Sequence, residues 1–341
     1  MSNCATNCNG PGTSNHPPVH FVLPADLVRE CELIDARRLD QHGRALTKDG
    51  VRAWTMQTYL ILKSEGIDVT CSTDFREQAI NIAHFLQVEQ ADCHSNAFIV
   101  CLRVDYPRHP LANVHIVQNQ SQAGKSAFWM PHWPPTDLVG RDPCRNKVVR
   151  VASMGIPWLS AGKRMDWQSE LLKHGFEFEY LVERGNWNDL RDVDVLLAIR
   201  SFDKNPHNGK PAWKLVNAWL ARIPLIAGHD SAYKQIGVPG EDYLLANSLN
   251  AAVNAVCRLR DDPLYYQRIV QKGLNKSQFY SRDATVERWR KLIYEELAPR
   301  YVAWNSSRIR RSLQRGLRST KGRIRQVLRR CRCLLQGARS P

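Results

Sequence analysis

Residues 195–246 alternate between short apolar runs and polar loops, and a stretch with helical periodicity follows each of the first two loops. A chain that repeats strand, loop and helix in this order folds into a parallel sheet covered by helices. In such sheets the ligand-binding loops follow the carboxyl ends of the strands. The loops that begin at Arg200 and at Gly228 are therefore the first places to look for function.

The helix expected from Pro211 carries Lys210, Lys214 and Asn217 at spacings that place them on one face. Two ammonium groups beside a first helical turn, whose free N–H groups already favour anions, predict a seat for a phosphate or diphosphate. A solvated polar face is the alternative. The long loop from Arg200 to Gly209 favours the anion site, because loops of that length in α/β units are usually functional or disordered.

The second loop begins with Gly228 and continues His229-Asp230-Ser231-Ala232-Tyr233. It places backbone N–H groups and small polar side chains at another helix start, which fits a ligand and a simple N-cap equally well. Gly155 follows the first strand of the same half of the chain. We expect the ligand contacts to come from Gly155, Arg200, Lys210, Lys214, Asn217, Gly228, His229, Asp230, Ser231 and Tyr233.

The chain has 341 residues, enough for two domains of ordinary size. Strands are expected near 19–23, 67–71, 97–102 and 114–118, and a fresh α/β unit starts at Lys147. The segment 129–145 holds four prolines and reads as a linker or cleft wall. We expect two Rossmann-like, doubly wound α/β domains, at 19–145 and 146–304, with a flexible lead at 1–18 and a tail at 305–341.

The net charge of +15 belongs to the tail. Residues 305–341 contain 12 Lys or Arg and no Asp or Glu, which leaves 36 basic and 33 acidic side chains in the first 304 residues. Apolar residues recur through the tail at helical spacing, which predicts a basic amphipathic helix at an anionic membrane surface. A disordered basic tail is one alternative, and a nucleic-acid contact is the less favoured one.

The ten cysteines include no pair with C-x-x-C spacing, so reduced thiols are expected and a structural metal is not. No secretion signal and no membrane span is apparent, which favours the cytoplasm, at the inner face of the membrane. Asp192-Val193-Asp194 resembles a metal-binding DxD motif, but the apolar strand follows these carboxylates instead of preceding them. We read both as residues that lead into a strand.

Four segments then resemble the donor-binding half of GT-B glycosyltransferases: KPAWKLVNAWLARIPLIAG (210–228), GEDYLLANS (240–248), LRDDPLYYQRI (259–269) and FYSRDATVERW (279–289). The first domain is similar only in outline. The resemblance implies a sugar transferred from a nucleotide-sugar donor onto a glycan or lipid-linked acceptor, as in cell-surface polysaccharide synthesis. It implies no cofactor beyond that co-substrate and no metal.

The chain departs from the family pattern at two positions. Retaining members commonly carry two glutamates eight residues apart, and here those positions hold Gly209 and Asn217. Retaining and inverting transfer therefore both stay open. An inverting enzyme needs a base from the first domain, for which Asp105 and His132 are the candidates, against the plainer roles of a turn-capping Asp and a solvent-facing His.

Two other classes compete with a transferase. A nicotinamide dehydrogenase would carry G-x-G-x-x-G after a strand, and this sequence has no such segment. A noncatalytic α/β protein that binds a membrane or nucleic acid would explain the tail, but it would not explain the Lys face or the polar loops.

Overall fold

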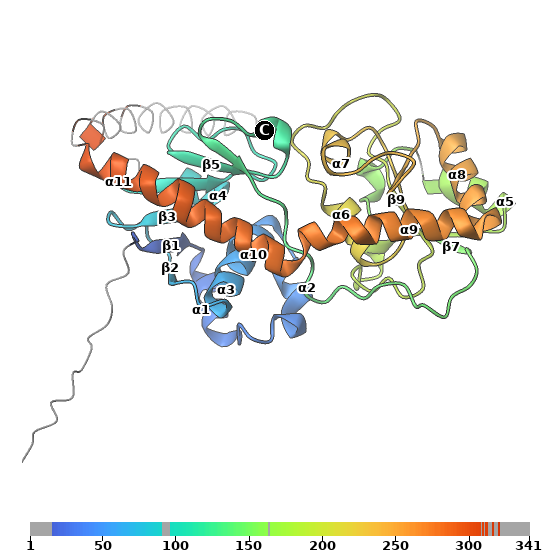
Figure 1. Ribbon diagram of the computed structural model, residues 1–341, viewed down its shortest axis with the longest axis horizontal. Helices are drawn as coiled ribbons and strands as arrows, with labels where there is room; N and C mark the ends of the chain where they lie inside the picture. Colours follow the sequence, from blue (N-terminus) through green and yellow to red (C-terminus); the bar gives the residue numbers. More distant parts are fainter. Residues whose placement is uncertain are drawn as a thin grey trace, which may run out of the picture.

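The computed structural model describes residues 16–90, 96–162 and 164–307, and beyond them residues 309, 311, 312, 316 and 320. It contains two sheets whose strands are all parallel, six in the first and five in the second. Helices pack around both (Figure 1). The expected α/β architecture of two Rossmann-like domains is confirmed.

The first sheet has the strand order β2 (Val69–Ser72), β1 (Val19–Val22), β3 (Ile80–His84), β4 (Phe98–Leu102), β5 (Val114–Val117) and β6 (Ala127–Trp129). Its main core, which includes α3, lies on one face, and a smaller cluster that includes Val88 of α4 lies on the other. The helical segments of this half are α1 (Ala25–Leu33), η1 (Leu39–His42), α2 (Gly43–Leu46), η2 (Arg52–Met56), α3 (Gln57–Ser64), α4 (Phe85–Gln90) and η3 (Gln120–Gln122).

The second sheet has the strand order β11 (Leu244–Leu245), β10 (Leu225–Ala227), β9 (Val195–Ala198), β7 (Arg150–Ser153) and β8 (Glu177–Tyr180). Two separate hydrophobic clusters cover it. Its helical segments are η4 (Pro157–Leu159), α5 (Arg164–Lys173), η5 (Leu181–Glu183), α6 (Trp213–Leu220), α7 (Ser231–Ile236), α8 (Leu249–Asp261) and α9 (Pro263–Ser277).

The last helices return to the first sheet. After α9 the chain continues through η6 (Gln278–Tyr280), α10 (Arg282–Lys291), η7 (Leu292–Leu297) and α11 (Ala298–Ser306), along the long axis of the molecule (Figure 1). Trp289, Tyr301 and Trp304 lie in the core of the first domain. Residues 282–304, which the sequence analysis placed with the second domain, thus pack on the first, because their apolar face finds its partners there.

Most of the strands lie close to the expected positions, but β3 and β6 were missed and α6 begins at Trp213 instead of Pro211. Helices α8, α9 and α10 begin at side-chain caps. The side chains of Ser248, Asp262 and Ser281 accept hydrogen bonds from the N–H groups of Ala251, Tyr265 and Ala284.

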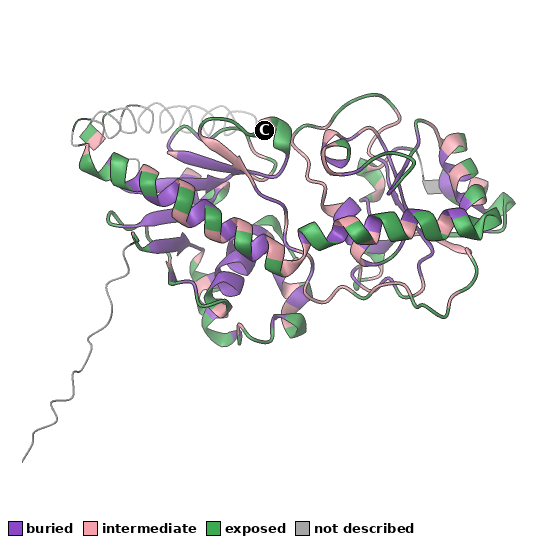
Figure 2. Cartoon of the chain, in the orientation of Figure 1, coloured by how far each residue is buried: buried purple, intermediate pink, exposed green. Residues whose placement is uncertain are grey.

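Buried residues follow the strands and the inner faces of the helices, while α9 and α10 expose their outer faces (Figure 2). The expected lead at 1–18 and tail at 305–341 lie almost entirely outside the described residues. Within the ranges that the structure describes, every helix is too short or too polar to cross a lipid bilayer.

Candidate functional site

The loops at the carboxyl ends of the two sheets meet. Gln118 and Asn119, which follow β5, are 3% and 0% exposed. Gln118 Nε2 donates to the Gly209 carbonyl oxygen at 2.7 Å, and Asn119 Nδ2 donates to the Lys210 carbonyl oxygen and to Ser231 Oγ, both at 2.9 Å. Two buried amides of the first domain therefore fix the positions of both ligand-side loops of the second.

An ion pair crosses the same boundary. Lys210 Nζ donates to Asp105 Oδ2 at 2.6 Å, and Gln118 Nε2 donates to Asp105 Oδ1 at 2.6 Å. The two charged side chains are 39% and 47% exposed, so the pair contributes about 0–1 kcal/mol to stability. A bound anion can therefore replace Asp105 as the ion-pair partner of Lys210 at a small cost in free energy.

Backbone strain lies close to both partners of this pair. Val104, which precedes Asp105, has φ 50°, and His207, whose carbonyl oxygen accepts from the Lys210 N–H at 2.8 Å, has φ 45°. The left-handed region is strongly disfavoured for a β-branched residue such as valine. Strain of this kind gathers at functional sites, where the surrounding structure holds it in place.

A second charged group lies where β9 and β10 end. Arg200 Nε donates to Asp230 Oδ1 at 2.7 Å, and Asp230 is 1% exposed. Asp230 Oδ2 has no hydrogen-bond partner among the described residues. Burial together with Asp230 raises the pKa of Tyr233, which stays a neutral phenol. The Asp230 carboxylate thus keeps one unpaired oxygen beside the Arg200 guanidinium group.

Lys214, in the first turn of α6, belongs to the same corner. Burial, and then the neighbouring Arg200 cation, lowers its pKa to about 7, although Asp230 opposes the shift. Lys210 also acts on Lys214 electrostatically. Arg200, Lys210 and Lys214 therefore form a cationic corner, and a bound anion would raise the pKa of Lys214 again.

His132 lies behind this arrangement. Its Nε2 is 3.0 Å from Gln118 Oε1, and its ring centroid is 4.2 Å from that of Trp54. Burial lowers the pKa of His132 to about 3. Because the amide nitrogen of Gln118 already donates to Asp105 and Gly209, its oxygen faces the imidazole, so we assign the proton to Nε2. His132 is then a neutral donor that orients Gln118.

Four expected residues remain: Asn217, Gly155, Gly228 and His229. Asn217 is fully buried, and neither of its amide atoms is hydrogen-bonded within the described chain, so its place in the site stays a prediction. Gly155 turns sharply after β7, where a Cβ would lie 2.1 Å from Ser160 Oγ. At Gly228 a Cβ would lie 3.1 Å from the Ser201 carbonyl oxygen. His229 Nδ1 is 3.2 Å from Lys234 Nζ.

The sequence analysis missed Gln118 and Asn119 of the site, and also His84, which lies where the strand order of the first sheet reverses. His84 ends β3 and is 2% exposed, and its Nδ1 accepts from the Leu86 N–H at 3.2 Å. Burial lowers its pKa to about 4. The strand order reverses between β1 and β3, which is where open parallel sheets bind ligands. A polar residue directly after a short apolar run was the available signal in each case.

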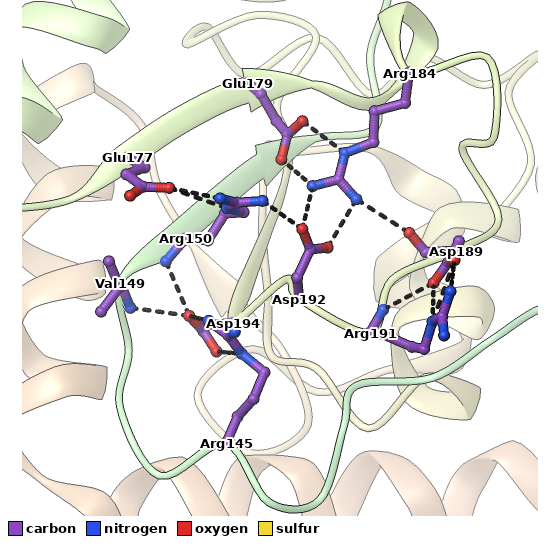
Figure 3. Close-up of polar contacts among 10 residues, drawn as sticks. All are labelled: Arg145, Val149, Arg150, Glu177, Glu179, Arg184, Asp189, Arg191, Asp192 and Asp194. Carbon is purple, nitrogen blue, oxygen red and sulfur yellow. Dashed lines mark hydrogen bonds and ion pairs between the residues drawn. The ribbon is translucent and has the colours of Figure 1, made fainter.

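The DxD-like pair lies at the amino end of β9, the central strand of the second sheet, and so at the end opposite to the loops described above. Asp194 is fully buried and accepts from Arg141, Arg145 and the N–H groups of Val149 and Arg150. Asp192 pairs with Arg150 and Arg184 (Figure 3). A hollow of about 750 Å³ adjoins this network, lined in part by Arg141, Arg145 and Arg260. Both carboxylates lead into β9 and bind arginines.

No arrangement of three or more His, Cys, Asp or Glu side chains suited to a metal ion occurs in the described part of the chain.

No family model matches the chain, and no curated protein is similar to it in sequence. The solved structures that resemble it include TarM, HepE and the galactosyltransferase WaaB. TarM of S. aureus has 11% identity and a TM-score of 0.45 over 64% of this chain, which spans 55% of the length of TarM.

HepE of Anabaena, solved with UDP and glucose, has 11% identity and a TM-score of 0.49, over 81% of this chain and 99% of HepE. The lipopolysaccharide outer core galactosyltransferase WaaB has 13% identity and a TM-score of 0.42, over 64% of this chain and 75% of WaaB.

Proposed function

We propose that this chain is a glycosyltransferase that moves a sugar from a nucleotide-sugar donor onto a hydroxyl group of a glycan or lipid-linked acceptor. The observation that carries the proposal is the cationic corner of Arg200, Lys210 and Lys214, which faces Asp105 across the domain boundary. The segment resemblance to donor-binding domains supports the same assignment. The acceptor class, and a role in cell-surface polysaccharide synthesis, are part of the proposal.

In this proposal the diphosphate of the donor binds at the cationic corner. Its negative charge grows as the bond to the sugar breaks, and fixed cations stabilise that charge more in the transition state than in the ground state. Arg200, Lys210 and Lys214 supply this positive charge from the protein itself, so the proposed step needs no metal ion. The nucleoside diphosphate leaves with the electron pair of the broken bond.

Asp105 is the residue we propose as proton acceptor. When Lys210 binds the diphosphate, Asp105 Oδ2 loses its ion-pair partner, while Gln118 still donates a hydrogen bond to Oδ1. The freed carboxylate oxygen then takes the proton of the acceptor hydroxyl as the new glycosidic bond forms. The low pKa of His132 favours Asp105 over His132 for this role, and leaves His132 to orient Gln118.

Calorimetric titration of the chain with UDP, GDP, ADP and NAD tests the function and the donor together. We expect micromolar binding of one nucleoside diphosphate. Lys210→Ala and Lys214→Ala should each weaken it about tenfold, since a hydrogen bond to a charged group contributes about 1.5–3 kcal/mol. Lys272→Ala, on the exposed face of α9, is the matched control. Unchanged affinity in both site variants would overturn the donor-site assignment.

Binding should also depend on pH through Lys214. With its pKa near 7 in the free protein, Lys214 is mostly neutral at pH 8, and a bound diphosphate raises that pKa and draws in a proton. Affinity should therefore fall as pH rises above 7, by up to about tenfold per unit. Titrations at pH 8 in buffers of different ionisation enthalpy will measure the proton uptake, which Lys214→Met should abolish.

The basic segment 305–341 extends the proposal to an anionic membrane surface, where a lipid-linked acceptor would also lie. We expect the chain to sediment with phosphatidylserine vesicles, and a chain that ends at Ser307 to stay in solution with nucleotide binding intact. A truncated chain that still sediments would move the membrane contact to another part of the protein.

A further inference from the structure

A basic hollow lies beside the amino ends of β7 and β8, at the end of the second sheet opposite to the candidate site. Its volume of about 750 Å³ is within the usual range for small-molecule sites. Four cationic side chains line it, and no acidic residue of the described chain does: the cations are Arg141, Arg145, Lys147 and Arg260. A hollow whose charged lining has a single sign attracts ligands of the opposite sign.

Arg141 fixes the shape of this lining. Its Nε donates to Asp194 Oδ1 at 2.9 Å, and its terminal nitrogens donate to the carbonyl oxygens of Arg145 at 2.8 Å and Lys147 at 3.1 Å. Its guanidinium carbon lies 5.4 Å from the centroid of the Tyr266 ring, and the Tyr266 hydroxyl donates to the Asp194 carbonyl oxygen at 2.9 Å. This part of the chain between β6 and β7 is therefore held in place before any ligand binds.

Arg145 and Lys147 still have free donors. Arg145 donates from Nε and Nη2 to the two oxygens of Asp194, at 2.9 and 2.8 Å (Figure 3), and its Nη1 has no hydrogen-bond partner among the described residues. Lys147 is exposed, and in the same part of the chain its ammonium group has neither a hydrogen-bond partner nor an ion-pair partner. Both side chains line the hollow, so these donors can bind an anion in it.

The charges around the hollow favour a dianion. Asp194, behind the lining, pairs with Arg141 and Arg145. Asp261 pairs with Arg260 at 2.7 Å. Four cations less these two carboxylates leave a charge of +2. A phosphate monoester carries about −1.5 to −2 at pH 7, so one such group nearly neutralises the hollow.

We propose that the basic hollow binds a small organic phosphate. The phosphate group of the ligand accepts hydrogen bonds from Arg145 and Lys147, and Arg260 adds the positive charge of α8. Val148 and Pro263, in the apolar part of the lining, contact the rest of the ligand. A bound phosphate thus joins the segment between the two domains to α8. The site is separate from the cationic corner, which lies at the other end of the same sheet, and the proposal does not depend on the proposed transfer reaction.

Calorimetric titration with phenyl phosphate at pH 7.5 tests the proposal in the wild-type chain and in Lys210→Ala/Lys214→Ala. We expect a Kd below about 1 mM in both, and weaker binding of benzenesulfonate, which has the same ring but a single charge. Hydrogen exchange followed by mass spectrometry should show protection of 141–149. No binding to the wild-type chain, or binding that the double variant loses, would overturn the proposal. A chain that binds no nucleoside diphosphate can still pass this test.

Substitutions in the lining test the individual cations. Lys147→Ala and Arg260→Gln should each weaken the binding of phenyl phosphate about tenfold, whereas Lys147→Arg, which keeps the charge, should retain it. Neither side chain pairs with Asp194, so these variants keep the ion pairs that stabilise the fold. Lys272→Ala, at an exposed position of α9 outside the hollow, is the matched control. Unchanged affinity in both Lys147→Ala and Arg260→Gln would show that the phosphate does not bind in the basic hollow.

Discussion

Replacing Asp194 with Asn is expected to lower the free energy of unfolding of the second domain by about 3 kcal/mol, because it leaves the partly buried charges of Arg141 and Arg145 without their buried carboxylate. Asp194 is fully buried, and its oxygens accept from Arg145 and from the Val149 and Arg150 N–H groups (Figure 3). Arg141 donates to Asp194 as well. The neutral amide would keep the shape but lose the charge, and its NH₂ group would face donors. Urea unfolding followed by tryptophan fluorescence measures the loss.

Asp194 also makes the stability of the fold depend on pH in the acid range. Burial alone would raise the pKa of Asp194, but hydrogen bonds from Arg145 and from the Arg150 and Val149 N–H groups outweigh it and hold the pKa below the ordinary range. A carboxyl group with a lowered pKa in the folded state stabilises the fold above about pH 4. That contribution is lost as the pH falls through the folded-state pKa, and the Asn variant should not show this loss.

Asp192→Asn is the control for Asp194. Asp192 pairs with Arg150 and Arg184 at the same end of the sheet, but its side chain is 39% exposed. Without Asp192, Arg150 still pairs with Glu177 and Arg184 with Glu179, so its removal should cost about 0–1 kcal/mol. Equal losses in the two variants would show that burial does not set the importance of Asp194.

Asp105→Asn is expected to lower the turnover number by about 10²–10⁴-fold, the usual contribution of a general base. The affinity for the nucleoside diphosphate should not fall, and is expected to rise a few-fold, since Lys210 loses the carboxylate that competes for it. Sugar transfer and calorimetric titration of the same sample measure the two effects separately. Asp68→Asn, at an exposed position of the first domain, is the matched control.

The contrast between turnover and binding makes this prediction specific. A purely structural Asp105 would change both in the same direction, because the ion pair to Lys210 and the hydrogen bond from Gln118 link it to the donor loops. Full turnover in Asp105→Asn would remove Asp105 as the base. His84, at the end of β3, would then be the next residue to test.

Much of the second domain could be predicted because its signals are local. A strand that is buried on both faces reads as a continuous apolar run, and the caps at Ser248, Asp262 and Ser281 lie within three residues of the groups that they bond. Lys210, Lys214 and Asp230 follow from their place after strands or at helix starts. Such features depend on neighbours in sequence, so sequence alone indicates them.

What the sequence could not predict depends on contacts between distant residues. The ion pair between Asp105 and Lys210 joins positions 105 residues apart. The contacts of Gln118 and Asn119 with the second domain also join residues that are far apart in sequence. The lysine spacing predicts Asn217 on the ligand face, but it does not show that the packing of α6 buries this residue completely. A spacing rule gives the shared face of a helix, but not which residues that face meets.

The sequence by itself determined the α/β class, the alternation of strands and helices, the helix caps and the loops that carry charge, since each is encoded by residues a few positions apart. Tertiary structure alone decided that the last helices pack on the first sheet, that Asp194 neutralises the arginines around it, and that Asp105 faces the cationic corner. These outcomes required the burial of apolar faces and charges against partners far away in the chain, and no local pattern records which partner that will be.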